Sequence, residues 1–375
     1  MPRPAAILAL AVALMALAAA AAGASGVRLV RVGTFSQPDY VAAPRGDAHR
    51  LFVVQRDGLI RLVRDGRVLR APFADLRAQV LDPKPRARGD RRGLLSVAFT
   101  TDYARTGLLY AMYVDKADRL RVDELRRSAG DPNRADPASR RLVIELGPAA
   151  RRDVGGQLQW GPGAALWIST GDEGAPASAQ DLGSLNGKLL LINPATGSGG
   201  RGYGIPHGNP FVRRAAARPE IFAYGLRDPW RFSLDSPQLF TLGDVGAQVQ
   251  EVDATSRALL RGASFGWPQV EGDVRRGPGH RGVLPLIVHP RGAGWCAVVG
   301  GYRVRDRSLP ALYGRYVYGD MCQSRLWAAR LTVNRAIGDG PLPLRVRSLV
   351  SFGLDGLNRL YAVSLAGGVW RFAAA

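Results

Sequence analysis

Short runs of apolar, β-branched and aromatic residues recur along the whole chain, and turns rich in Gly, Asp and Pro separate them. Segments with the 3.6-residue periodicity of an amphipathic helix are nearly absent after the first residues. Many short strands joined by tight turns are typical of an all-β protein. The pattern therefore predicts strands throughout the chain.

Several stretches resemble one another, because each reads as a strand, a turn rich in Gly or Asp, and usually a second strand. They are RLFVVQRDGLIRLV (50–63), ALWISTGDEG (165–174), QLFTLGDVGAQVQEV (238–252), RYVYGDMCQSRLWAA (315–329) and RLYAVSLAGGVWRF (359–372). A hairpin repeated at irregular intervals indicates radial repetition, as in a β-propeller, rather than one sandwich. Six blades of roughly 60 residues fit the length, and seven would fit as well.

The two ends of the chain suggest how the ring closes. The last strand, GVWRF (368–372), can pair with the first strand, VRLVRV (27–32), which leaves no exposed sheet edge. Loops from several blades would then converge on one axial pocket, and function in such a fold resides in those loops. We therefore predict an all-β fold, a six-bladed β-propeller.

The N-terminus, MPRPAAILALAVALMALAAAAAGASG, has a basic start, an apolar stretch and a small-residue end. The sequence AGA before Ser25 predicts a signal peptide over residues 1–24 that is cleaved after Ala24. An uncleaved anchor is disfavoured, because the run from Ala6 to Ala22 is short for a membrane span. Residues 25–375 would then be one exported propeller domain, secreted or held in the periplasm or cell envelope.

Export gives meaning to Cys296 and Cys322, the two cysteines of the chain. An oxidising compartment would let them form a disulfide. Metal binding by two thiolates alone is the weaker interpretation, because structural zinc uses four ligands. We therefore predict one disulfide.

The formal net charge is +20, and all but three of the 51 basic residues are arginine. The arginines are spread along the chain, as a codon bias toward arginine would produce. Attraction to anionic polymers of the cell envelope is the functional alternative. Nucleic acid is disfavoured as a partner, because no motif that binds it is recognisable.

Eight motifs from about residue 35 to the C-terminus carry a family resemblance. They are RRGLLSVAFTTDYARTGLLYAMYVD, GGQLQWGPGAALWISTGDEG, QDLGSLNGKLLLINPATG, YGIPHGNPF, PEIFAYGLRDPWRFSLD, LGDVGAQVQEVD, ASFGWPQVEG and VVGGYRVRDRSLPALYGRYVYGD. Together they resemble the soluble glucose/sorbosone dehydrogenase family, the PQQ-dependent aldose sugar dehydrogenases. The resemblance implies a six-bladed propeller that oxidises an aldose at its anomeric carbon. A histidine base, PQQ as the hydride acceptor and a calcium ion would carry the reaction.

At the position of the family's histidine, in a His-Asn-Gly-Gly motif, this chain reads DVGG, beginning at Asp153. Three interpretations of Asp153 are open: a replacement general base, a ligand of a cation, or a cap of its own turn. An ordinary aspartate has a pKa near 3.9 and is a poor base unless burial or a nearby carboxylate raises that pKa. None of the four histidines stands at this position; they are His49, His207, His280 and His289.

The resemblance also implies residues that contact the cofactor. They are Arg227 and Asp228 in YGLRDPW, Trp267 in SFGWP, Arg305 in GGYRVRDR and Arg325 in CQSRLW. Arginines would hold the carboxylates of PQQ, although each could instead lie on a solvated blade edge. Asp228 replaces the family's usual asparagine, and an ionised carboxylate cannot donate a hydrogen bond to an anionic cofactor.

The segment GDVGAQVQEVD matches the loop whose backbone carbonyls bind calcium in the family. It would supply the carbonyl oxygens of Val245 and Gly246 as calcium ligands, with Asp244 nearby. Oxygen ligands suit this hard cation. An ordinary turn between two strands is the alternative.

Two classes of function follow. The first is an exported PQQ- and calcium-dependent dehydrogenase of an unidentified sugar, with Asp153 in the place of the base and an unknown electron acceptor. The second is a catalytically degenerate propeller that binds glycans or a cell-envelope partner. A hydrolase is disfavoured, because no Ser-His-Asp arrangement stands out.

Overall fold

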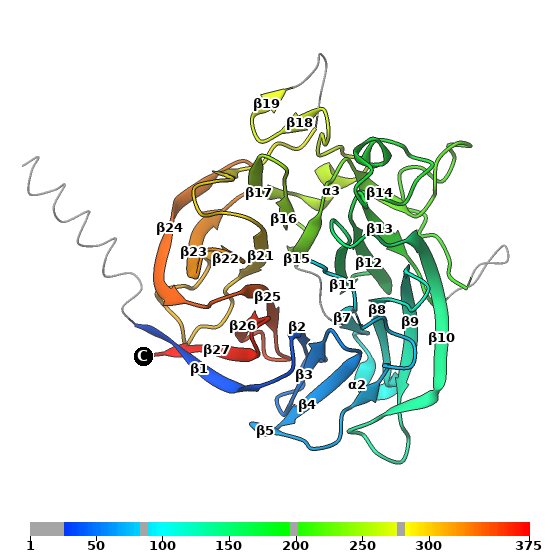
Figure 1. The fold of residues 1–375 in the computed structure, drawn as a ribbon, viewed down its shortest axis with the longest axis vertical. Helices are drawn as coiled ribbons and strands as arrows, with labels where there is room; N and C mark the ends of the chain where they lie inside the picture. Colours follow the sequence, from blue (N-terminus) through cyan, green and yellow to red (C-terminus); the bar gives the residue numbers. More distant parts are fainter. Residues whose placement is uncertain (1–25, 83–88, 196–201, 276–281) are drawn as a thin grey trace, which may run out of the picture.

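The computed structural model describes residues 26–82, 89–195, 202–275 and 282–375. The predicted signal peptide, residues 1–24, lies outside the described residues. The described strands form six main sheets that stand around one axis (Figure 1), so the predicted six-bladed β-propeller is confirmed. In this part of the chain, no helix combines the length and the apolar character needed to cross a membrane.

The first three blades follow one another along the chain, each numbered here from its innermost strand outward. Blade 1 consists of β2 (Pro38–Ala42), β3 (Arg50–Gln55), β4 (Leu59–Arg64) and β5 (Arg67–Val68), with β6 (Ala74–Asp75) also paired to β4. Blade 2 consists of β7 (Leu94–Phe99), β8 (Leu108–Val114), β9 (Arg119–Arg127) and β10 (Ala135–Pro148). Blade 3 consists of β11 (Gly155–Gly161), β12 (Ala165–Thr170), β13 (Lys188–Ile192) and β14 (Ile221–Tyr224).

The other three blades complete the ring. Blade 4 consists of β15 (Pro229–Ser236), β16 (Leu239–Val245), β17 (Val249–Thr255) and β20 (Ile287–Pro290). Blade 5 consists of β21 (Val298–Arg303), β22 (Tyr316–Asp320), β23 (Arg325–Leu331) and β24 (Ala336–Arg345). Blade 6 consists of β25 (Leu349–Leu354), β26 (Leu360–Ser364), β27 (Gly368–Ala374) and β1 (Val27–Thr34).

Short elements decorate the loops. They are the helices α2 (Tyr103–Thr106) and α3 (Arg257–Leu260), the 3₁₀ helix η1 (Pro176–Ala179) and the hairpin of β18 (Val270–Glu271) and β19 (Val274–Arg275).

The ring is closed by its two terminal strands. β1 pairs antiparallel with β27, with Leu29 opposite Phe372, and the blue and red strands lie side by side in Figure 1. This pairing confirms the predicted closure, in which the first strand of the chain becomes the outermost strand of the last blade.

The middle strands of the blades are buried on both faces. Every residue of β12 and of β13 is buried, because neighbouring blades pack against both sides of the sheet. Such strands read as continuous apolar runs rather than as alternating ones. This packing explains why the sequence shows short unbroken hydrophobic segments.

The innermost strands of the six blades end at a common cavity of about 720 Å³. Residues at or near their C-terminal ends line this strand-end cavity: Ala42, Phe99, Trp160, Ser236, Arg303 and Leu354. The loops that precede the innermost strands must therefore lie at the opposite end of the ring. We call that end the loop end; it also carries the turns between the second and third strands of the blades.

Candidate functional site

Asp153 stands at the loop end, in the turn that leads into β11. Its φ is +58°, and Gly155 and Gly156 after it also have positive φ, 66° and 127°. Aspartate tolerates this left-handed conformation better than most residues do. A Cβ atom at Gly155 would lie 2.7 Å from the backbone nitrogen of Gly171, so the turn packs directly against the loop after β12. The predicted Gly-Gly turn is thus fixed by backbone contact.

The side chain of Asp153 forms an ion pair with Arg227. Its Oδ2 accepts a hydrogen bond from Nη2 of Arg227 at 2.9 Å, and the two side chains are 16% and 17% exposed. Burial raises the pKa of Asp153 to about 6; Asp228 adds to the rise and Arg227 opposes it. The side chain is therefore directed to a residue of another blade, and not to the backbone of its own turn.

Arg227 connects three segments of the loop end. Besides its bond to Asp153, its Nη1 donates to the carbonyl oxygen of Val245 at 2.7 Å. Its guanidinium also lies over the Trp267 ring, 5.6 Å from the ring centroid. Trp267 in turn donates from Nε1 to Oδ2 of Asp172 at 2.8 Å. Arg227 and Trp267, both predicted to contact a cofactor, therefore contact each other.

Asp228 is fully buried and ties loops together. Its Oδ1 accepts from the backbone N–H of Gly155, and its Oδ2 accepts from Nη1 of Arg91, both at 2.9 Å. Its own backbone N–H donates to Oδ1 of Asp244 at 2.7 Å. Both carboxylate oxygens are thus used in holding neighbouring loops in place.

Arg91 was missed by the sequence analysis. It lies just before β7, as Asp153 lies before β11 and Arg227 before β15. The pattern Arg-Arg-Gly at the entry to an innermost strand was the available signal. In a chain with so many arginines, that signal does not stand out.

The turn after β16 is held from several sides. Asp244 is buried and accepts from the backbone N–H groups of Arg227 and Asp228 at 2.9 and 2.7 Å. Burial raises the pKa of Asp244 to about 7. On the other side of Gly246, the N–H of Gln248 donates to Glu271 at 2.6 Å.

The donor atoms at this turn do not fit calcium as they are arranged. Calcium takes about six to eight oxygen ligands. The carbonyl of Val245, one of the predicted ligands, already accepts from Arg227, so a dication on the same oxygen would face a guanidinium. Among the described residues, one group of three possible His, Cys, Asp or Glu ligand atoms converges, formed by Cys296, Asp320 and Cys322, and its two sulfurs form a disulfide.

The two arginines that contact Asp153 and Asp228 are not free to hold the carboxylates of PQQ either. Arg227 is neutralised by Asp153, and Arg91 by Asp228. Arg325 begins β23 and is exposed at the loop end. A cofactor carboxylate that bound Arg227 or Arg91 would therefore have to displace the aspartate that this arginine already binds.

The structure places Arg305 apart from the other predicted residues. It follows β21 and lines the strand-end cavity, where it donates to both carboxylate oxygens of Asp235 at 2.8 and 2.6 Å. The prediction that Arg305 joins the cofactor-contacting group is corrected here. The physical reason is that loops following the innermost strands face the opposite end of the ring.

The predicted disulfide between Cys296 and Cys322 is confirmed, with the two Cα atoms 5.8 Å apart. It connects the loop before β21 to the turn between β22 and β23. His289 lies nearby in β20, where its ring stacks on Trp295 with centroids 3.6 Å apart. Its Nε2 lies 2.9 Å from the hydroxyl oxygen of Tyr318, and partial burial lowers the pKa of His289 to about 4.

Comparisons with known proteins agree with the sequence motifs. The model of the Glucose / Sorbosone dehydrogenase family matches residues 37–351. Hedgehog-interacting protein of Mus musculus is 28% identical over 348 residues, which cover 86% of this chain and 48% of that protein. Aldose sugar dehydrogenase YliI of Escherichia coli is 27% identical over 230 residues, 59% of this chain and 56% of that protein. The chain thus spans about half the length of these curated relatives.

Solved structures share the fold. The PQQ-bound aldose sugar dehydrogenase of Streptomyces coelicolor superposes with a TM-score of 0.73 at 20% identity, over 93% of this chain and 98% of that one. The apo form of the soluble aldose sugar dehydrogenase of Escherichia coli gives 0.74 at 18% identity, over 93% and 100% of the two chains. At these identities the likeness concerns the fold.

Proposed function

Because the chain belongs to the glucose/sorbosone dehydrogenase family, we propose that its ligand is a carbohydrate and that it binds this ligand without PQQ. One observation carries the proposal. The guanidinium of Arg227 binds both the Asp153 side chain and the Val245 carbonyl, at 2.9 and 2.7 Å. Asp153, Arg227 and Val245 were expected to act as base, cofactor contact and calcium ligand. They are instead hydrogen-bonded to one another through the Arg227 guanidinium.

The charge of the loop end indicates an anionic glycan. Four exposed arginines lie in its loops or at their edges: Arg151, Arg291, Arg325 and Arg347. None of the four forms an ion pair with a carboxylate in the described part of the chain. Guanidinium groups bind carboxylate and sulfate groups through paired hydrogen bonds, and a positive surface attracts polyanions. A uronate-rich or sulfated polysaccharide supplies such groups.

The relatives support a binding function in this family. Hedgehog-interacting protein, which aligns with 86% of this chain, is named for an interaction and not for a reaction. A propeller can keep its fold while substitutions in its loops change its function, because the fold does not determine the chemistry of the site.

A PQQ-dependent aldose dehydrogenase is the second candidate, and one observation favours it. The pKa of Asp153 is raised to about 6, close to the ordinary value of about 6.5 for histidine. An aspartate with that pKa could accept a proton near neutral pH. This candidate requires Arg227 to release both Asp153 and Val245.

Glycan binding can be measured by titration calorimetry of the exported chain with polygalacturonate, with neutral dextran as the matched control. We expect polygalacturonate to bind, more weakly as salt rises, and to bind equally well with EDTA present. The double variant Arg325→Gln/Arg347→Gln should bind about tenfold more weakly. Arg305→Gln, at the opposite end, should bind like the unmodified protein. Equal binding of dextran, or no binding of either polymer, would contradict the proposal.

A further inference from the structure

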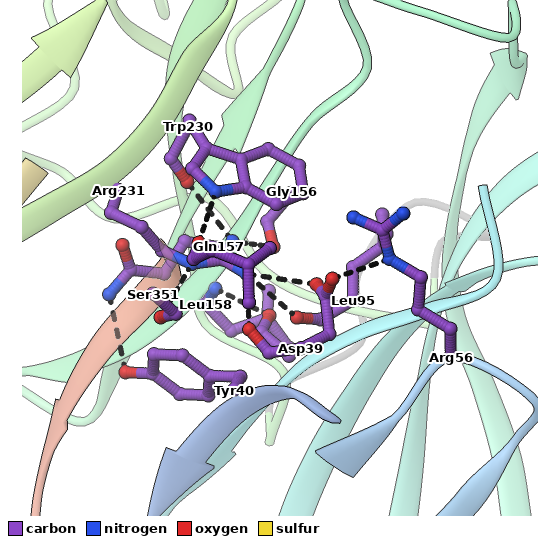
Figure 2. Close-up of polar contacts among 12 residues, drawn as sticks. Asp39, Tyr40, Arg56, Leu95, Gly156, Gln157, Leu158, Trp230, Arg231 and Ser351 are labelled. Carbon is purple, nitrogen blue, oxygen red and sulfur yellow. Dashed lines mark hydrogen bonds and ion pairs between the residues drawn. The ribbon is translucent and has the colours of Figure 1, made fainter. Parts of the chain in front are cut away.

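Arg231 crosses the axis of the ring and links five blades. It leaves β15 and is fully buried. Its Nη2 donates to Asp39 of β2 at 3.0 Å, its Nη1 to the carbonyl of Gly156 in β11 at 3.1 Å, and its Nε to Ser351 of β25 at 3.0 Å. A further bond reaches the carbonyl of Leu95 in β7 (Figure 2).

Asp39 is shared between two arginines. Its Oδ2 accepts from Arg231, and its Oδ1 accepts from Nε of Arg56 at 2.5 Å (Figure 2). All three side chains are withdrawn from solvent, with exposures of 0% for Asp39 and Arg231 and 2% for Arg56. Two guanidinium groups against one carboxylate leave one positive charge in excess on the axis. We call these three residues the axial triad.

An uncompensated buried charge is costly, because the protein interior solvates it poorly. The lowered pKa of Arg231, caused by burial, reflects the same environment. The backbone carbonyl of Asp90 accepts from Nη1 of Arg56 at 3.2 Å, and the carboxylate of Asp90 pairs with Arg92. The axial triad is therefore not neutralised by that carboxylate.

One donor of the axial triad has no partner in the described part of the chain. Nη2 of Arg56 is buried and makes no hydrogen bond with a described residue. Arg56 lines a cavity of about 10 Å³ together with Arg91, Trp230 and apolar side chains of blades 5 and 6. This is close to the least space that holds one ordered water, so the cavity admits no more than one small molecule or ion. Among the described residues, no carboxylate lines the cavity, and the charge of Arg91 is balanced by Asp228.

We propose that this axial cavity binds one small monovalent anion, such as chloride, through Nη2 of Arg56. The anion supplies the negative charge that the axial triad lacks and a partner for the free donor. The volume of the cavity limits the size of the anion. The one excess guanidinium of the axial triad requires a single negative charge. None of the four arginines of the proposed glycan surface lines this cavity.

Bromide replaces chloride and can be located by anomalous diffraction. Crystals of the unmodified protein grown in bromide should show one anomalous peak in the cavity between Arg56 and Trp230. A water molecule there, with no anomalous signal, would overturn the proposal.

Thermal unfolding in sodium chloride and in sodium gluconate at equal ionic strength gives a second test. Gluconate is too large for the cavity, so the Tm should fall by about 5 °C when it replaces chloride. Arg56→Gln removes the excess charge and should have the same Tm in both salts. Arg305→Gln, a matched change at a surface ion pair, should keep the full difference.

Two outcomes of this second test would count against the anion. One is an equal Tm of the unmodified protein in the two salts, and the other is a difference that Arg56→Gln retains. The bromide experiment decides the question if Arg56→Gln does not fold.

Discussion

Nη2 of Arg227 lies 2.9 Å from Oδ2 of Asp153, and the two residues come from different blades. The pair joins the turn before β11 to the turn before β15 at the loop end. The sequence motifs predict a base at Asp153 and a cofactor contact at Arg227. In this chain the two neutralise each other, so Asp153 cannot act as a base and Arg227 cannot hold a carboxylate of PQQ while this pair persists.

Loss of Arg227 should destabilise the fold. In Arg227→Gln, the partly buried Asp153 and the Val245 carbonyl lose their donor, and we expect the free energy of unfolding to fall by about 2 kcal/mol. Urea unfolding measures this. The control is Arg105→Gln, which breaks an exposed pair with Asp102 and should cost less than about 0.5 kcal/mol. Equal losses in the two variants would show that the Arg227 pair is an ordinary surface contact.

Stability should decrease as the pH rises toward 9, and Glu173 is one cause. Burial raises the pKa of Glu173 to about 9, and its Oε2 accepts from the N–H of Ala150. The folded protein therefore holds this proton more tightly than the unfolded chain, whose glutamate has a pKa of about 4.3. The resulting stabilisation is complete below about pH 4 and is lost as the pH rises through about 9.

The corresponding measurement is urea unfolding at a series of pH values between about 5 and 9. Glu173→Gln should lose stability less steeply over this range, because glutamine does not titrate. Asp131→Asn, a change at a carboxylate that is 45% exposed in another loop, serves as the control and should keep the original slope. An unchanged slope in Glu173→Gln would refute this assignment.

Lys188 should be essential for the loop between β12 and β13. Its ammonium group is fully buried and donates to the carbonyls of Ser178, Ala179 and Asn186. Lys188→Met keeps the length of the side chain and leaves these carbonyls without their donor, at a cost of about 3 kcal/mol. Lys116→Met, at an exposed turn, should change stability by less than about 0.5 kcal/mol. Chemical denaturation of both variants checks the difference.

The disulfide should stabilise blade 5 by restricting the unfolded chain. Its cysteines are 26 residues apart, and a loop of that length corresponds to about 3 kcal/mol. The double variant Cys296→Ser/Cys322→Ser should therefore unfold at a lower Tm than the oxidised protein. Addition of a reductant should lower the Tm of the unmodified protein and leave that of the variant unchanged. A reductant effect that persists in the variant would contradict this account.

Most of the fold could be predicted because its signals are local. Each repeated hairpin has its own apolar strands and its own turn residues. The first and last strands can also be recognised in the sequence, so their pairing could be predicted. Asp153, Arg227 and Asp244 were also found, since each lies in a motif that the family shares. The structure brings these three residues together at the loop end.

The rest depended on contacts between distant segments. Arg91 pairs with Asp228 across 137 positions, and Arg231 with Asp39 across 192. Such pairs are made by the closure of the ring and leave no local pattern. The position of Arg305 could not be predicted without knowing where β21 ends. A residue just before an innermost strand lies at the loop end, whereas a residue just after that strand lies at the opposite end of the propeller.

Thermal unfolding with PQQ and calcium added together tests the central claim most directly. If Arg227 is committed to Asp153 and Val245, neither addition should raise the Tm, and no aldose in a broad panel should reduce an artificial electron acceptor. A Tm that rises with the concentration of PQQ in the presence of calcium, accompanied by reduction of the acceptor with an aldose, would contradict the account and establish a dehydrogenase.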